Sequence, residues 1–231
     1  LGTWLAKGDA LEALEQRADA LSAYESALRL DPRNAGAWAR KATLLFALDR
    51  YDDAAKAYDA ALEADPGSAD LWHGKARALY RLKAYADAAD AADRATRYAP
   101  EDRKTWYVYA MSLQGAQRLE QSVAAFDRAL GLDPSDGKAW FGKARSLESL
   151  KRYEEAIAAY HHAAEIEPGF VPAWLREGSC HLELHRYEEA LDAFARVLER
   201  EPRNGDGVRG QADALEALGR TADAFAASER L

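Results

Sequence analysis

The sequence predicts an all-α protein, a right-handed superhelical solenoid of antiparallel helix pairs, from three columns of residues that repeat along the chain. Six of the seven prolines lie 34 residues apart, and so do all six tryptophans. Small residues recur at two further places in the same period. A period of this size is typical of stacked repeats, since one helical hairpin cannot bury its own apolar face. The two columns are Pro32, Pro66, Pro100, Pro134, Pro168 and Pro202, and Trp4, Trp38, Trp72, Trp106, Trp140 and Trp174.

Numbers in the first repeat serve as positions for all repeats. Apolar and small residues at positions 4, 8, 11 and 14 predict a first helix over positions 2–14. Those at 17, 20, 21, 24, 27 and 28 predict a second helix, which ends before the proline at position 32. We therefore predict one solenoid domain over residues 1–231, with repeats at 1–34, 35–68, 69–102, 103–136, 137–170, 171–204 and an incomplete 205–231.

Position 34 is predicted to cap the first helix of the following repeat. It carries side chains that accept hydrogen bonds from free backbone amides at a helix start. These residues are Asn34, Ser68, Asp102, Asp136 and Asn204, and the exception is Phe170.

The columns resemble those of the tetratricopeptide repeat (TPR) family. That pattern has a large residue at position 4, small residues at 8 and 20, an aromatic at 24, Ala at 27 and Pro at 32, and it covers essentially the whole chain. One departure is lysine at position 7, in Lys41, Lys75 and Lys143, where we expect the stem to pack and the ammonium to reach water. Another is Ala92 at position 24, whose missing ring we expect Tyr98 or Tyr109 to replace.

The resemblance implies that positions 2, 5, 6, 9, 12 and 13 of the first helices face a concave groove. In repeats two to six these positions hold seven basic and three acidic side chains, whereas the outward positions of the second helices hold sixteen acids and five bases. A chain of net charge −8 is thus predicted to carry a basic groove that steers an anionic segment inward. Gly74 and Gly142 are expected to leave room there. The candidate groove residues are Arg40, Phe46, His73, Arg77, Tyr80, Lys104, Tyr107, Met111, Lys138, Phe141, Arg145, Leu175 and Arg176.

The predicted function is a protein–protein interaction scaffold that binds a peptide or helix with a carboxylate and a bulky apolar side chain. The alternative is that the repeats are the regulatory or substrate-docking arm of a larger enzyme. A third interpretation is an architectural solenoid that associates end to end, because Trp4 and Phe225 are expected to be poorly covered.

Other functions are disfavoured by the sequence. It shows no phosphate loop, dinucleotide fingerprint or nucleophile with a base, so we predict no enzyme, no catalytic residue and no cofactor. The net charge argues against nucleic acid, no apolar run is long enough for a membrane span, and the single cysteine fits a cytoplasmic location. We predict no metal site at Glu177, Cys180, His181 and His185, and we expect His161 and His162 to be solvated.

Overall fold

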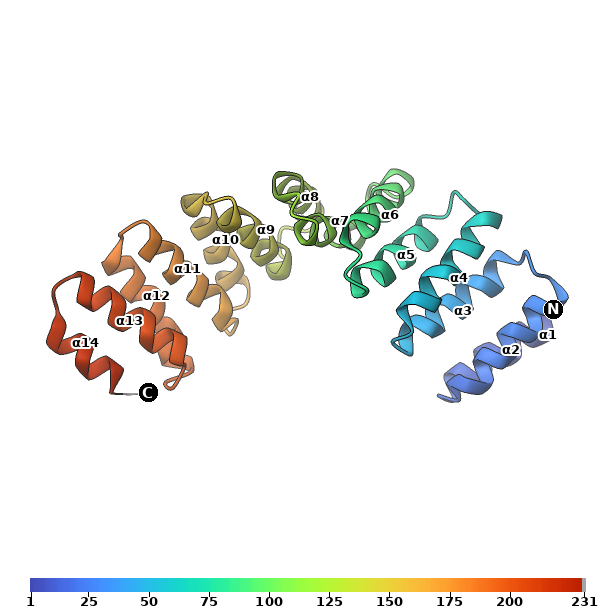
Figure 1. Ribbon diagram of the computed structural model, residues 1–231, viewed down its shortest axis with the longest axis horizontal. Coiled ribbons are helices and arrows are strands. Elements are labelled where there is room, and N and C mark those ends of the chain that lie inside the picture. The colour runs from blue at the N-terminus through green and yellow to red at the C-terminus, as the bar shows by residue number, and fades with distance from the viewer. Residues whose placement is uncertain (230–231) are drawn as a thin grey trace. The chain divides into compact units, whose positions relative to one another are not determined.

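The computed structural model describes residues 1–229, and all the regular structure in that range is helical (Figure 1). Fourteen helices are present in the described range. Their bounds are α1 (Gly2–Ala13), α2 (Arg17–Leu30), α3 (Ala35–Ala47), α4 (Tyr51–Ala64), α5 (Ala69–Arg81), α6 (Tyr85–Tyr98), α7 (Arg103–Gly115), α8 (Leu119–Leu132), α9 (Gly137–Ser149), α10 (Tyr153–Ile166), α11 (Val171–Glu183), α12 (Tyr187–Arg200), α13 (Gly205–Ala217) and α14 (Thr221–Ser228). Each predicted repeat thus holds one helix pair, as the periodicity predicts.

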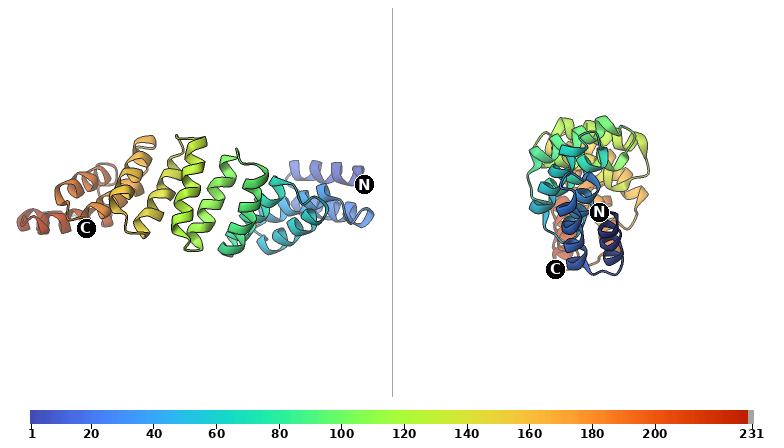
Figure 2. Two further views of the ribbon diagram at one scale, coloured as in Figure 1. Left: turned by 90° about the horizontal axis from the view of Figure 1, so that it is seen from above. Right: turned by 90° about the vertical axis from the view of Figure 1, so that its right-hand side faces the viewer.

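The helices form two compact units, Leu1–Arg118 with α1 to α7 and Leu119–Leu231 with α8 to α14. Within each unit every helix packs against the next one in sequence, so neighbouring helices lie side by side (Figure 2). Odd-numbered helices also meet, as α3 and α5, α5 and α7, and α11 and α13 do. The fold is therefore an all-α solenoid of helix pairs, while the single domain over the whole chain stays a prediction.

The predicted caps begin the odd-numbered helices. The side chain of Asn34 accepts from the Ala37 amide at 2.9 Å, and those of Ser68, Asp102, Asp136 and Asn204 each accept from an amide two or three residues later. Phe170 makes no such bond, and α11 begins instead with proline in its first turn.

The tryptophan and proline columns share a period because they bond to each other. The indole Nε1 of Trp38 donates to the carbonyl oxygen of Pro32 at 2.8 Å, and the three following tryptophans repeat this bond at 2.7–2.9 Å. Each of these four loops is thereby fixed to the helix that follows it.

A left-handed residue ends each first helix at position 15. In the turn after α3, Asp49 has φ of 59°, its amide donates to Phe46, and the Arg50 amide donates to Leu45. This is the Schellman arrangement, which favours glycine because a β-carbon is strained at positive φ. Only the seventh repeat has glycine there, Gly219; the other six are Glu15, Asp49, Lys83, Gln117, Lys151 and His185.

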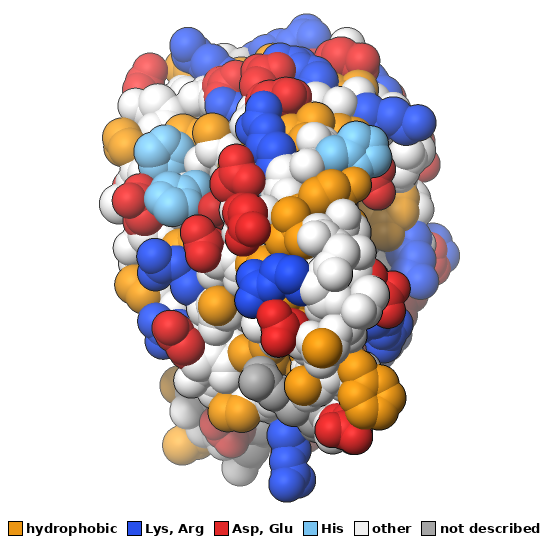
Figure 3. All heavy atoms as spheres, turned by 90° about the vertical axis from the view of Figure 1, so that its left-hand side faces the viewer, with side chains coloured by type: hydrophobic (Ala, Val, Ile, Leu, Met, Phe, Trp, Pro, Cys, Tyr) orange, Lys and Arg blue, Asp and Glu red, His pale blue; other side chains and the backbone are white. Residues whose placement is uncertain are grey.

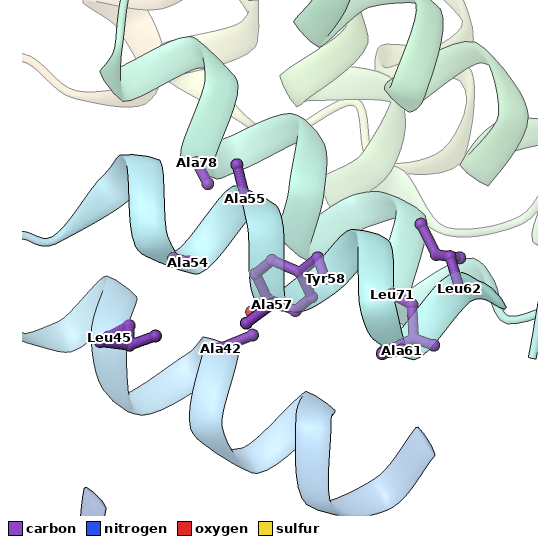
Figure 4. Packing of buried hydrophobic residues seen from close by; sticks show 10 residues of the cluster. All are labelled: Ala42, Leu45, Ala54, Ala55, Ala57, Tyr58, Ala61, Leu62, Leu71 and Ala78. Atoms are coloured by element: carbon purple, nitrogen blue, oxygen red, sulfur yellow. The ribbon is translucent and has the colours of Figure 1, made fainter. Parts of the chain in front are cut away.

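The core is built from alanines and, in five of the repeats, from one buried ring of the second helix. In the cluster of Figure 4, Tyr58 of α4 lies among alanines of α3, α4 and α5. Where Ala92 replaces that ring, Val108 and Tyr109 pack against it, whereas Tyr98 is 55% exposed. The expectation that a tyrosine fills this space is therefore confirmed for Tyr109 and wrong for Tyr98.

Candidate functional site

A hydrogen-bonded chain joins α5 and α7 on the predicted groove face of the first unit. His73 Nδ1 lies 2.9 Å from the hydroxyl of buried Thr105, and that hydroxyl donates to the Asp102 carboxylate. A carboxylate only accepts, so Thr105 must accept from His73, which leaves Nε2 of the neutral ring as an acceptor. Burial lowers the pKa of His73, so the ring is neutral at pH 7.

The Asp102 carboxyl that ends this chain is held ionised. Burial opposes ionisation, but the hydrogen bonds from Thr105 and from two backbone amides of α7 outweigh it and lower the pKa of Asp102. The same carboxylate caps α7, so helix geometry and the tautomer of His73 depend on one residue. Arg77, Asp70 and Lys104 are the other charged groups that act on His73.

Two arginines one turn apart on α5 lie on rings of the preceding repeat. The guanidinium carbon of Arg77 is 4.5 Å from the centre of the Phe46 ring, and that of Arg81 is 4.3 Å from the centre of Tyr51. Phe46 and Tyr51 themselves meet edge to face at 5.3 Å. Stacking of this kind leaves the N–H edge of a guanidinium available for a carboxylate.

The predicted basic groove is less basic than its residue count suggests. Arg40 pairs with Asp9 at 2.8 Å, and Arg81 lies 3.6 Å from Asp49. In contrast, Arg77 and Lys104 are exposed and have no carboxylate within salt-bridge distance in the described part of the chain. These two side chains are the free cations of the groove face in the first unit.

The second unit shows the same division between paired and free cations. Arg176 donates to Glu148 at 3.1 Å, and Glu148 also accepts from the Tyr160 hydroxyl. Lys138 and Arg145 are exposed, and no acid among residues 1–229 pairs with either.

The apolar groove candidates are only partly available. Phe141 packs edge to face on Phe170 at 4.8 Å and lies 5.4 Å from Tyr160, so it fills space between helices. Tyr80 meets Tyr85 at 5.4 Å. The remaining candidates, Tyr107, Met111 and Leu175, are half-buried.

Gly74 and Gly142 do not leave room for a ligand, so that expectation is wrong. A β-carbon on Gly142 would lie 2.3 Å from Cζ of Phe126, and one on Gly74 would lie 2.4 Å from Cζ of Tyr58. Each glycine therefore admits the core ring of the preceding repeat, which fills the space beside it.

A depression of about 320 Å³ lies between α11 and α13 in the second unit. Its lining combines an aliphatic wall and an aromatic floor with charged side chains. The lining residues are Leu175, Arg176, Ser179, Leu182, Phe194, Asp206, Arg209, Gly210 and Asp213.

The lysines at position 7 make the same pair of contacts in three repeats, with a tryptophan and with an acid, and we call this arrangement the latch. The sequence did not predict it. Each ammonium lies 5.2–5.4 Å from the ring centre of the tryptophan three residues earlier and 2.5–3.0 Å from an acid at position 25 of the preceding repeat. Their side chains are 19–21% exposed, so each stem packs as expected, and each ammonium is paired with an acid. The pairs are Lys41–Glu25, Lys75–Asp59 and Lys143–Asp127.

The sixth repeat reverses the charges of this latch. Position 7 is Glu177, and position 25 of the preceding repeat is His161, whose Nδ1 lies 3.2 Å from Glu177 Oε1. Glu177 Oε2 is buried without a partner, and burial raises the pKa of this carboxyl. His161 also meets the Trp174 ring edge to face, and His162 packs on Trp140 at 4.8 Å. Although both histidines are exposed, neither is simply solvated as expected.

The histidines and cysteine of α11 do not converge. Cys180 is buried, which raises the pKa of its thiol to about 12, and His185 bonds to the hydroxyl of Tyr187. Within residues 1–229, no three histidine, cysteine or acidic side chains are placed to share a metal ion. In the same range, no helix has both the length and the apolar character required to cross a membrane.

The fold and the repeated contacts define the class of protein. Sequence models of the tetratricopeptide repeat match residues 5–69, 40–103 and 107–169, and a second such model matches 147–204. The chain belongs to the tetratricopeptide repeat family. No curated protein matches it in sequence.

Several solved structures share the fold. YrrB, described as a TPR protein with an unusual peptide-binding site, is 22% identical, with a TM-score of 0.71 over 80% of this chain and 95% of its own. A MamA structure is 20% identical, with a TM-score of 0.70 over 73% and 92%. MamA from Desulfovibrio magneticus RS-1 is 15% identical, with a TM-score of 0.69 over 74% and 97%. At these identities the likeness concerns the fold alone.

Proposed function

We propose that the chain is a protein-interaction scaffold whose groove face binds a peptide or helix bearing a carboxylate and a bulky apolar side chain. One observation carries the proposal. The guanidinium carbon of Arg77 lies 4.5 Å from the centre of the Phe46 ring, and the side chain has no acidic partner in the part of the chain that the structure describes. Its guanidinium is thus oriented before any ligand arrives, so less side-chain entropy is lost on binding.

The neighbours of Arg77 suit the same ligand. Lys104 adds a second free cation from α7, and Nε2 of His73 offers an acceptor to a peptide N–H or a hydroxyl. Phe46, half-buried beneath Arg77, offers apolar surface at its edge. Exposed arginines and aromatic rings are the usual anchors of protein interfaces. The peptide-binding site described for YrrB, which shares the fold, supports this use of it.

Fluorescence anisotropy tests the proposal directly. The probe is a fluorescein-labelled peptide of alternating leucine and glutamate, compared with one in which glutamine replaces every glutamate. We expect the acidic peptide to bind more tightly, with an affinity that falls as salt rises. Arg77→Glu removes one attraction and adds a repulsion, which should weaken binding roughly tenfold or more.

Arg94→Glu is the matched control. Arg94 is also exposed and stacked on a ring, 5.1 Å from the centre of Trp72, but it belongs to an outward position of α6. Its reversal changes net charge equally and should leave affinity nearly unchanged. Equal losses for both variants would show that only net charge matters, and the proposed groove site would then be rejected. Arg145→Glu examines the free cation of the second unit in the same assay.

The two alternative functions stay hypotheses. The docking-arm interpretation predicts a catalytic domain in the same polypeptide, and the sequence of the gene tests it. End-to-end association rests on Phe225, 66% exposed, and Trp4, 38% exposed. Light scattering at millimolar concentration tests it, and a monomer there would refute it.

A further inference from the structure

The depression between α11 and α13 differs in charge from the groove residues discussed so far. It is lined by two arginines and two aspartates, so its composition alone favours no sign. The pairing of these groups decides the sign, because an ion already paired at short range contributes little to an incoming charge.

Both arginines of the lining have carboxylate partners. Arg176 is 3.1 Å from Glu148, and Arg209 is 3.5 Å from Asp206. Asp213 has no cation within salt-bridge distance among the described residues. Glu216 is exposed one turn further along α13 and also lacks a cationic partner there. Residues three apart share one face of a helix, so the unpaired charge beside the depression is negative.

The rest of the lining is largely apolar. Leu175 and Leu182 of α11 are half-buried. The ring of Phe194 is pressed against Gly210, where a β-carbon would lie 2.3 Å from Cζ. The floor therefore cannot move aside without disturbing the core. The volume, about 320 Å³, is at the lower end for ligand pockets and suits side chains of a peptide better than a whole cofactor.

We propose that this depression binds a lysine or arginine side chain of a partner peptide, next to an aliphatic residue of the same peptide. The cation pairs with Asp213, and the aliphatic side chain rests on Leu175 and Leu182. Charge complementarity selects this occupant, since an acidic side chain would meet an unpaired aspartate and no free cation of the lining. The subsite takes the opposite charge from the proposed anion-binding site at Arg77 and Lys104, and it uses neither of these two residues.

Chemical-shift mapping on the ¹⁵N-labelled full chain tests the proposal. The probes are three acetylated and amidated tripeptides, Leu-Lys-Leu, Leu-norleucine-Leu and Leu-Glu-Leu. We expect the lysine peptide to shift the amides of Ser179 and Gly210 and to bind up to about fivefold more tightly than the norleucine peptide, as one exposed ion pair allows. The glutamate peptide should bind most weakly.

Asp213→Asn should remove the preference for lysine over norleucine, and Asp213→Glu should keep it. Asp192→Asn is the matched control, because Asp192 is an exposed acid at an outward position of α12. An unchanged spectrum away from α13 shows that each variant is folded. Equal affinities for lysine and norleucine in the native chain, or a preference that survives Asp213→Asn, would overturn the proposal.

This outcome is independent of the anion-binding test. If the lysine peptide fails here while the acidic peptide still responds to Arg77→Glu, only the cationic subsite is wrong. If the lysine peptide binds and the acidic peptide does not, the proposed function fails and the subsite stands.

Discussion

The reversed latch between α10 and α11 yields a prediction about stability. In the third repeat, Trp72 is approached by both Lys75 and Arg94, and Lys75 pairs with Asp59. Trp174 keeps an arginine, 4.9 Å from its ring centre, but has the reversed pair beside it. The double variant His161→Asp, Glu177→Lys therefore rebuilds the arrangement of the third repeat in the sixth.

The magnitude follows from what the double variant removes and adds. It removes the buried, unpartnered Oε2 of Glu177, an orphan acceptor that costs about 1–3 kcal/mol. It adds a half-exposed ion pair of about 0.2–1 kcal/mol and an ammonium over the Trp174 ring of about 0.5–1 kcal/mol. Burial of the new ammonium offsets part of this gain. We expect a net stabilisation of about 1–2 kcal/mol, or about 3–6 °C in Tm.

Urea unfolding followed by tryptophan fluorescence, with thermal unfolding beside it, measures the change. The single variants complete a double-mutant cycle, in which a favourable coupling is expected because each alone leaves a mismatched junction. The reverse exchange at an ordinary junction, Asp59→His with Lys75→Glu, is the control and should destabilise by a similar amount. A double variant no more stable than the native chain, or strictly additive single changes, would refute the reasoning.

Four further predictions concern single sites. Burial raises the pKa of Glu177 in the folded protein above its value in the unfolded chain. The free energy of unfolding should therefore fall as pH rises from 4.5 through the raised pKa. Glu177→Gln should remove that fall, as measured by urea unfolding at several pH values. Lys83→Gly should raise the free energy of unfolding by about 0.5–1 kcal/mol, since it relieves φ of 61°; a loss of stability would contradict the strain argument. Gly142→Ala should cost about 1–3 kcal/mol by collision with Phe126, and Phe126→Leu in the same chain should recover part of the loss. Trp38→Phe should cost about 0.5–1.5 kcal/mol through the lost indole bond, and an unchanged unfolding midpoint would show that bond to be unimportant.

Much of the fold could be predicted because its determinants are local. The caps at Asn34 and Asp102 act within three residues, and the amphipathic spacing acts within one helix. The left-handed residue at position 15 could not be predicted from lysine or glutamate, whose propensities do not favour that conformation. Gly219, and more weakly Asp49 and His185, are the residue types at this position that favour it.

The groove was harder to predict because its electrostatics depends on pairs that join different repeats. Arg40 and Asp9 are 31 residues apart, and Arg176 and Glu148 are 28 apart. A count of charges by position treats all of them as free. Because the pairs Arg40–Asp9 and Arg176–Glu148 remove charges from that count, contact geometry selects the charges that remain for a ligand. At the C-terminal end of the molecule, too, acidic and basic side chains lie interspersed among apolar ones (Figure 3).

The indole-to-carbonyl bond has a consequence for how this protein could be cut and rejoined. Because Trp38 secures the loop at Pro32, a transplanted cassette should begin within the loop, upstream of the proline, and not at the first residue of α3. A repeat transplanted from that point keeps both the indole and the carbonyl oxygen to which it donates. A repeat transplanted from the helix start would take the indole but leave the carbonyl in the original protein.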